Sequence, residues 1–163
     1  FDNLNGNFFS SAKTSLSDSI IINNCSFSNI TGTLLKFDTE LDKKGYYNVE
    51  KIKITNTSFV NHNGQILTML RGGNDESTMG PLLVFSKNKI TKSNTGNADI
   101  PFILLIGIQK TIFDENIFQN SNEGKAVNVY KDYVKADHFY GNNHLLNLGI
   151  VVADKFVRFA NRG

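Results

Sequence analysis

The sequence predicts an all-β protein, a right-handed parallel β-helix of about six coils. A short motif recurs along the chain: an apolar residue, Asn two positions later and Gly five positions later, most clearly at Phe59, Asn61 and Gly64. Around this motif, apolar and polar residues alternate in runs too short for helices. Recurrence with strand-like alternation is typical of a solenoid whose coils stack on one another, and the usual crossover preference gives the handedness.

Composition supports many regular turns within a single domain. The 163-residue chain has 22 Asn but only 2 Pro and no Trp. Asn tolerates left-handed backbone angles and bonds its own backbone, so evenly spread Asn indicates turns. A hydrophobic content of 40% suits one core formed by residues 1–163. The net charge of +2 and the absence of a basic run argue against nucleic acid, and no apolar run is long enough for a membrane span.

The first coil is incomplete, because the motif begins at Phe1 and only a strand at 7–10 follows it. In the second coil an alternating strand at 19–23 precedes Phe27, and a strand at 33–37 follows. Because the chain opens in the middle of a coil and without Met, we expect it to be the C-terminal part of a longer chain.

The third coil is the clearest. Ile52 and Ile54 alternate before Phe59, and a strand at 65–70 follows Gly64. In a strand, alternate residues point to the same face, so both isoleucines are expected to face the core.

Charged and glycine-rich loops at 38–48 and 71–81 interrupt the repeats. Beyond them, Ile90 takes the aromatic position of the fourth coil and Phe118 that of the fifth. Loops of unequal length between constant coils are what a solenoid accommodates on one face.

The fourth and fifth coils continue in strands at 100–106 and 126–130. The sixth coil is degenerate, with a strand at 134–137, either Phe139 or Tyr140 in the aromatic position, and an apolar stretch at 145–152.

Stacking at the ~4.8 Å interstrand spacing predicts two internal ladders. The apolar ladder is expected to contain Phe27, Phe59, Ile90 and Phe118. An amide ladder at the corners is expected to contain Asn29, Asn61 and Asn120.

Cys25 and the histidines are interpreted as structural residues. Cys25 is expected to be a small buried packing residue rather than a nucleophile. The three histidines lack metal-ligand spacing, so we predict no metal site and place His62 at a corner or on the surface.

A longer signature occupies the middle of the chain. It consists of Y-Y-N-V at 46–49, N-T-S-F at 56–59, L-R-G-G-N-D-E-S-T-M-G-P at 70–81 and G-I-Q at 107–109. This pattern resembles the C-terminal β-helical domain of two-domain polysaccharide lyases of family 6, the alginate lyase and chondroitinase B group. With its repeat context, the resemblance covers most of residues 1–150 and implies a pectate-lyase-like solenoid.

Members of that family cleave uronic-acid polysaccharides by β-elimination, which needs a base, an acid and a cation beside the uronate carboxylate. The resemblance places these groups, a Lys, an Arg and a calcium ion held by Asn and Glu, in an N-terminal catalytic β-helix. Their Glu-x-Glu and Lys-Ser motifs are absent here, so we expect no catalytic residue and no cofactor in this chain.

The resemblance thus implies an accessory C-terminal domain of a periplasmic or extracellular bacterial lyase. Its partners would be the N-terminal catalytic β-helix of the same chain and an acidic polysaccharide. One alternative is a non-catalytic carbohydrate-binding or structural module without a lyase partner. A weaker alternative is that this chain itself cleaves polymer.

Five residues are candidates for contact with substrate or with the catalytic domain: Arg71, Asp75, Glu76, Gln109 and Lys110. The guanidinium fork of Arg71 fits a uronate carboxylate. The favoured alternative pairs Arg71 with Asp75 or Glu76 inside the loop and leaves Lys110 as a solvated loop lysine. Calcium binding by Asn74, Asp75 and Glu76 is less favoured, because the alternating oxygen ligands of a calcium loop are missing.

Overall fold

The computed structural model describes residues 1–11, 15–37, 48–70, 81–96, 100–106, 108, 110–119, 121, 125–130, 137–140, 144–145, 149–152 and 158–159. From residue 125 onward the description covers the strands and their pairing. Four of the predicted site residues and one member of the predicted amide ladder lie outside the described residues: Arg71, Asp75, Glu76, Gln109 and Asn120.

The described residues form strands and no helix, and the strands assemble into three parallel sheets. The β1 sheet contains β1 (Phe9–Ser10), β4 (Leu35–Phe37), β7 (Leu67–Leu70), β10 (Ile103–Ile106), β13 (Lys125–Tyr130) and β16 (Gly149–Val152). The β2 sheet contains β2 (Ser17–Asn23), β5 (Val49–Thr55), β8 (Leu82–Ser86), β11 (Lys110–Asp114), β14 (Asp137–Tyr140) and β17 (Arg158–Phe159). The β3 sheet contains β3 (Ser26–Ser28), β6 (Ser58–Val60), β9 (Lys89–Thr91), β12 (Ile117–Gln119) and β15 (His144–Leu145).

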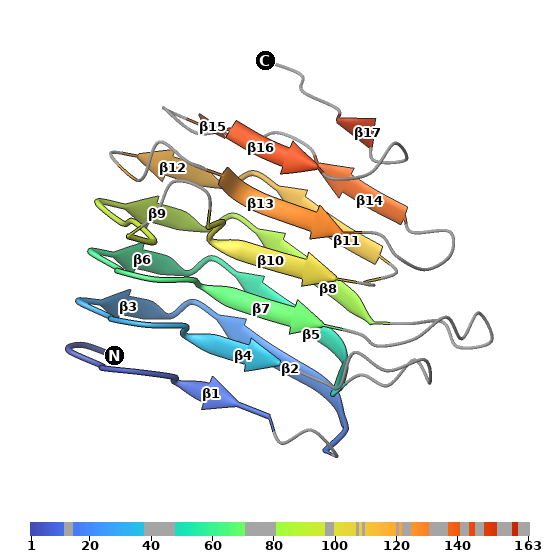
Figure 1. The fold of residues 1–163 in the computed structure, drawn as a ribbon, viewed down its shortest axis with the longest axis horizontal. Helices are drawn as coiled ribbons and strands as arrows, with labels where there is room; N and C mark the ends of the chain where they lie inside the picture. Colours follow the sequence, from blue (N-terminus) through green and yellow to red (C-terminus); the bar gives the residue numbers. More distant parts are fainter. Residues whose placement is uncertain are drawn as a thin grey trace.

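Every strand pairs with the corresponding strand of the next coil, so the coils stack one upon another (Figure 1). Successive members of a sheet are three strands apart in the sequence, which is the connectivity of a parallel β-helix. The predicted all-β parallel β-helix is therefore confirmed.

The β3 sheet is the element that the sequence did not predict as strands. Most of its strands are three residues long, and two left-handed residues enclose β3, β6 and β9. The left-handed residues around the sheet have φ between 50 and 57°: Asn24, Asn29, Asn56, Asn61, Lys87, Lys92 and Glu115. Asn is the non-glycine residue that adopts this conformation most readily, which explains part of the high asparagine content.

The aromatic positions of successive coils lie in register. Backbone pairing joins Phe27 to Phe59, Phe59 to Ile90 and Ile90 to Phe118, and all four side chains are fully buried. The rings of Phe27 and Phe59 are stacked, with centroids 5.5 Å apart. Because Ile90 has no ring, the aromatic contact of Phe59 on its other side is with Phe85 of the β2 sheet, at 6.2 Å.

The amide ladder is shorter than predicted. Asn61 Nδ2 donates to Asn29 Oδ1 at 2.6 Å, and Asn29 Nδ2 donates to Asp2 Oδ1 at 2.8 Å. The corresponding corner of the next coil is occupied by Lys92, whose backbone is also left-handed. A lysine has no amide oxygen to accept the next bond, so the run of amides ends at Asn61.

The aromatic position of the last coil was predicted wrongly. Leu145, not Phe139 or Tyr140, pairs with Phe118, and Phe139 pairs with Ile112 in the β2 sheet. Of the strand predicted at 134–137, residues 134–136 lie outside the described residues, and residue 137 begins β14 (Asp137–Tyr140). Both sheets border the same core, so an aromatic residue suits either one and only the backbone pairing distinguishes them.

Candidate functional site

The strands that flank the predicted site residues lie on adjacent coils of the helix. Residues 71–81 join β7 to β8, and residues 107–109 join β10 to β11. Leu70 pairs with Ile106, and Leu82 pairs with Lys110, so the two connections begin and end on adjacent coils. The loop that contains Arg71, Asp75 and Glu76 and the segment that contains Gln109 therefore start and finish side by side.

Lys110 is the predicted site residue that the structure describes. It is the first residue of β11 and is exposed, and its backbone N–H donates to the carbonyl of Pro81 at 3.3 Å. The alternative that Lys110 is a loop residue is therefore wrong. Lys51 and Lys110 flank Leu82 in register on adjacent strands of the β2 sheet.

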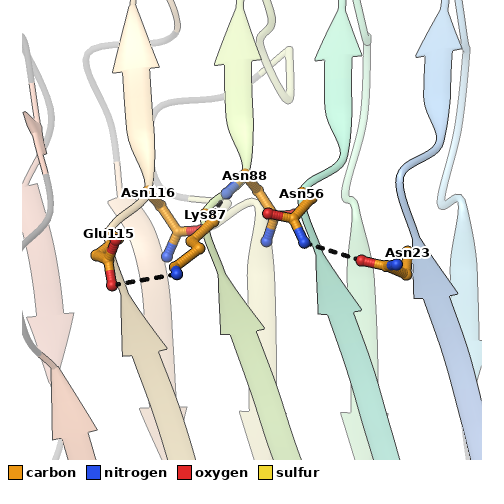
Figure 2. Close-up of polar contacts among 6 residues, drawn as sticks. All are labelled: Asn23, Asn56, Lys87, Asn88, Glu115 and Asn116. Atoms are coloured by element: carbon orange, nitrogen blue, oxygen red, sulfur yellow. Dashed lines mark hydrogen bonds and ion pairs between the residues drawn. The ribbon is translucent and has the colours of Figure 1, made fainter.

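A different corner, where the β2 sheet turns into the β3 sheet, also carries polar side chains. Its left-handed residues, here named the corner row, are Asn24, Asn56, Lys87 and Glu115. The residues that follow them, here named the inner row, are Cys25, Thr57, Asn88 and Asn116. Figure 2 shows members of both rows on successive coils.

The inner row satisfies backbone groups that the turn leaves inside the protein. Asn88 Nδ2 donates to the Ile54 carbonyl at 2.9 Å, and Asn88 Oδ1 accepts the Thr57 N–H at 3.0 Å. Asn116 repeats the pattern one coil later, donating to Phe85 O at 2.8 Å and accepting the Asn88 N–H at 3.0 Å. Because buried backbone groups need partners, amides at these positions hold adjacent coils together.

Cys25 differs from its predicted environment. It is half-buried rather than buried, and its Sγ lies 3.5 Å from the Asn23 carbonyl. Its place in the inner row puts it at the corner, with only part of its surface against the core.

Replacing Asn88 by alanine should lower the free energy of unfolding by about 2–3 kcal/mol, because it leaves the Thr57 N–H buried without a partner and removes a hydrogen bond to the Ile54 carbonyl. Asn88→Thr is the matched variant, since the Thr57 hydroxyl fills the same position, donating to Thr55 O at 2.9 Å. Urea unfolding should rank Asn88→Thr between the wild type and Asn88→Ala. Equal losses in the two variants would show that the hydrogen bonds contribute little.

The outer side of the same corner is exposed and carries both amides and charges. Asn56 Nδ2 donates to Asn23 Oδ1 at 2.9 Å, and the Thr55 hydroxyl donates to the same oxygen at 2.9 Å. One coil further on, Lys87 Nζ lies 3.8 Å from Glu115 Oε1 (Figure 2). Both of these side chains are at least half exposed, so their ion pair contributes little to stability.

Two shallow hollows flank the corner row. The β3-side hollow has a volume of about 470 Å³ and is lined by Asn24, Cys25, Ser26, Asn56, Thr57, Ser58, Lys87 and Lys89. The β2-side hollow has a volume of about 500 Å³ and is lined by Ile21, Asn23, Lys53, Thr55, Asn56, Val84, Ser86 and Lys87. Because Asn56 and Lys87 line both, the two hollows adjoin, and together they are named the corner site.

Three lysines give the corner site a positive charge. Lys53 lies in register between Ile21 and Val84, and its side chain is exposed. Lys89 lies on β9 and is also exposed. Within the described residues no carboxylate forms an ion pair with Lys53 or Lys89, whereas Lys87 shares Glu115.

Sequence reasoning missed the corner site, although a signal for it exists. The residue three positions before each aromatic position is Asn24, Asn56, Lys87 or Glu115. Aligning the coils on this position would have separated a polar corner from the core. The change from Asn to Lys at residue 87 would then have indicated a local charge.

His62 is buried at the other corner, where a corner or surface position was predicted. Its side chain is only 1% exposed, and Nε2 lies 3.0 Å from the Gln65 carbonyl oxygen. A carbonyl can only accept, so Nε2 carries the proton of the neutral ring. Burial lowers the pKa of His62 below 6.5 and outweighs the backbone contacts that favour the charged ring.

Acidification should destabilise the protein through His62. Below about pH 6.5 the His62 side chain of the unfolded chain binds a proton that the folded chain does not. The free energy of unfolding therefore decreases as the pH is lowered, until the pH reaches the lower pKa of His62 in the folded protein. His62 should contribute at most about 1.4 kcal/mol per pH unit to the slope of the unfolding free energy against pH, and this contribution should vanish above about pH 7. The test is urea unfolding of the wild type and of His62→Gln at a series of pH values from about 7 downward, comparing how the free energy of unfolding changes with pH in each protein. Parallel curves for the two proteins would contradict the prediction.

The described residues contain no group of three or more His, Cys, Asp or Glu placed to hold a metal ion. In the same part of the chain, no helix has the length and apolar character needed to cross a membrane.

No protein-family model matches this chain, and no curated protein matches it either. The resemblance to polysaccharide lyases of family 6 therefore rests on the sequence motifs at 46–49, 56–59, 70–81 and 107–109.

Proposed function

We propose that this chain is the accessory, non-catalytic β-helix of a bacterial polysaccharide lyase that acts on uronic-acid polymers of the alginate or dermatan type. In this proposal the β-elimination is carried out by an N-terminal catalytic β-helix of the same, secreted chain. Stacking of one β-helix on the other would extend the solenoid and the surface along which a polymer can lie.

The observation that carries the proposal is that the strands flanking two of the lyase-like segments lie on adjacent coils. Residues 71–81 and 107–109 both connect the β1 sheet to the β2 sheet, and they do so on adjacent coils. A solenoid places its variable connections on one face, and such faces commonly bind ligands. Residues that resemble a lyase domain would then converge where the extended solenoid presents its loops.

The experiment compares this chain with the longer gene product. Ultraviolet absorbance of unsaturated uronates should rise when the longer protein is mixed with alginate or dermatan sulfate. It should stay flat with residues 1–163 alone. The sequence encoded upstream of Phe1 should also contain the Glu-x-Glu and Lys-Ser motifs. Turnover by residues 1–163 alone, or an upstream region without these motifs, would overturn the proposal.

A second candidate function, a carbohydrate-binding module without a lyase partner, is favoured by the lysines and amides of the corner site. The two candidates differ in the upstream sequence, because a free-standing module needs no catalytic motifs there. Both are compatible with binding of an acidic polysaccharide by the described surface.

A further inference from the structure

We propose that the corner site binds an acidic polysaccharide. The site lies outside the loop edge at which the sequence placed its candidates, at the opposite end of β5 and β8. The loop edge and the corner site lie at the two ends of β8, whose five residues span about 16 Å at the usual rise per residue. This inference does not depend on the lyase link, because the same surface would serve a free-standing module.

Charge is the first argument. Lys53, Lys87 and Lys89 line the two adjoining hollows, and no carboxylate is among the lining residues. Asp114 and Glu115 are on β11 or directly follow it, so their negative charge borders the Lys87 end of the site. Neighbouring like charges attract an anionic ligand and bring it to the surface faster.

Hydrogen-bonding capacity is the second argument. Asn23 Oδ1 accepts bonds from Asn56 and Thr55. Among the described residues, however, none bonds to the amide nitrogen of Asn23 or to the amide oxygen of Asn56. One donor and one acceptor therefore face the solvent beside the lysines and can bind sugar hydroxyl groups.

An apolar strip is the third argument. Ile21 is 63% exposed and Val84 is half-buried, and both flank Lys53 in register and line the β2-side hollow. A sugar ring has an apolar C–H face and a polar rim. A binding surface that combines apolar contact with a few oriented polar groups matches both parts of the ring.

The shape of the site favours a polymer over a small anion. The hollows are shallow, and they extend over the coils of β2, β5 and β8, along the stacking direction. A ligand that repeats along its length can meet the equivalent positions of successive coils. Several weak contacts then add up on one chain.

The test is direct binding by the whole 163-residue protein, measured by calorimetry at low salt. The probes are a linear polyuronate, a sulfated glycosaminoglycan, neutral amylose and a single-stranded oligodeoxynucleotide. The polyuronate or the sulfated polymer should bind, with an affinity that falls as salt is added, and amylose should not. The first two probes distinguish carboxylate from sulfate as the recognised group.

The variants exploit the left-handed backbone of the corner row. Lys87→Asn removes a charge but places at this position the residue that Asn56 provides one coil earlier, so the fold should persist. It should weaken binding about fivefold. Lys92→Asn is the matched control. Lys92 belongs to the same coil as Lys87 and has a similar positive φ, but it lies at the other corner and lines neither hollow. It should leave the affinity unchanged.

Removing the carboxylate of Glu115, which competes with the ligand for Lys87, should change the binding affinity in the opposite direction. Glu115→Gln frees Lys87 from its 3.8 Å ion pair and should strengthen binding about threefold. The proposal is overturned if neither acidic polymer binds, or if the oligodeoxynucleotide binds as tightly as they do. It is also overturned if Lys87→Asn and Lys92→Asn weaken binding equally. None of these results depends on the lyase assay, so failure of the site and failure of the proposed function can be told apart.

Discussion

Replacing Phe59 by alanine should lower the free energy of unfolding by about 3–5 kcal/mol, the range usual for removing a buried phenylalanine ring. Phe59 is fully buried. The centroid of its ring lies 5.5 Å from that of Phe27 and 6.2 Å from that of Phe85, and both ring pairs are stacked. Removing the ring would leave a cavity between two coils and break the aromatic stack in its middle. Urea unfolding followed by circular dichroism measures the loss.

The control for this variant is Phe59→Ile, which copies Ile90 at the same position of the next coil. A β-branched side chain fits the strand and fills part of the cavity, so the loss should be about 2 kcal/mol. If Phe59→Ala were no less stable than Phe59→Ile, the aromatic ladder would not be the principal contact between these coils.

Replacing Gly64 by alanine should cost at least about 3 kcal/mol, because two penalties combine at this residue. The φ angle of Gly64 is +140°, which side-chain-bearing residues rarely adopt. In addition, a Cβ there would overlap the backbone of Gly32 in the preceding coil. Backbone atoms of a stacked coil cannot move aside as a flexible side chain can, so the coils themselves would have to separate. The urea midpoint of Gly64→Ala measures the cost.

Gly6→Ala separates the two penalties. Gly6 also has a positive φ, +102°, but a Cβ at Gly6 would meet no atom within 4 Å. Its cost should therefore be limited to backbone strain, about 1–2 kcal/mol. Equal losses for Gly6→Ala and Gly64→Ala would mean that strain alone, and not the close approach of coils, fixes the glycine at residue 64.

Much of the fold follows from local patterns that the chain repeats. The alternation of Ile52 and Ile54 predicts inward-facing residues, and both are fully buried in β5. The strands predicted at 33–37 and 65–70 contain β4 and β7. These elements were predictable because a strand with one buried face has an alternating pattern regardless of what lies next to it.

The last coil and the β3 sheet were not predictable in the same way. A three-residue strand such as β6 is too short to show alternation. Phe139 and Leu145 are both apolar, so pattern alone does not say which of them stacks on Phe118. Hydrogen bonds between coils made that choice.

Of the two candidate sites, one could be predicted from the sequence and the other could not. The lyase-like run at 70–81 is visible in the sequence, and the strand pairing adds that β7 and β8, which flank it, lie beside β10 and β11 of the next coil. The corner site has no run of its own. Lys53 and Lys87 are separated in the sequence by the whole of a coil, yet both line the β2-side hollow.

By itself, the sequence determined that this protein is a parallel β-helix, because the recurring apolar residue, Asn and Gly require equivalent turns and the alternation requires strands. Tertiary structure alone decided which polar side chains meet. Asn56 reaches Asn23 and Lys87 reaches Glu115 only because the coils stack in one register, and a register is a relation between distant segments. The physical reason is that burial is encoded locally, in the period of a strand, whereas contact across coils depends on the pairing of backbones far apart in the chain.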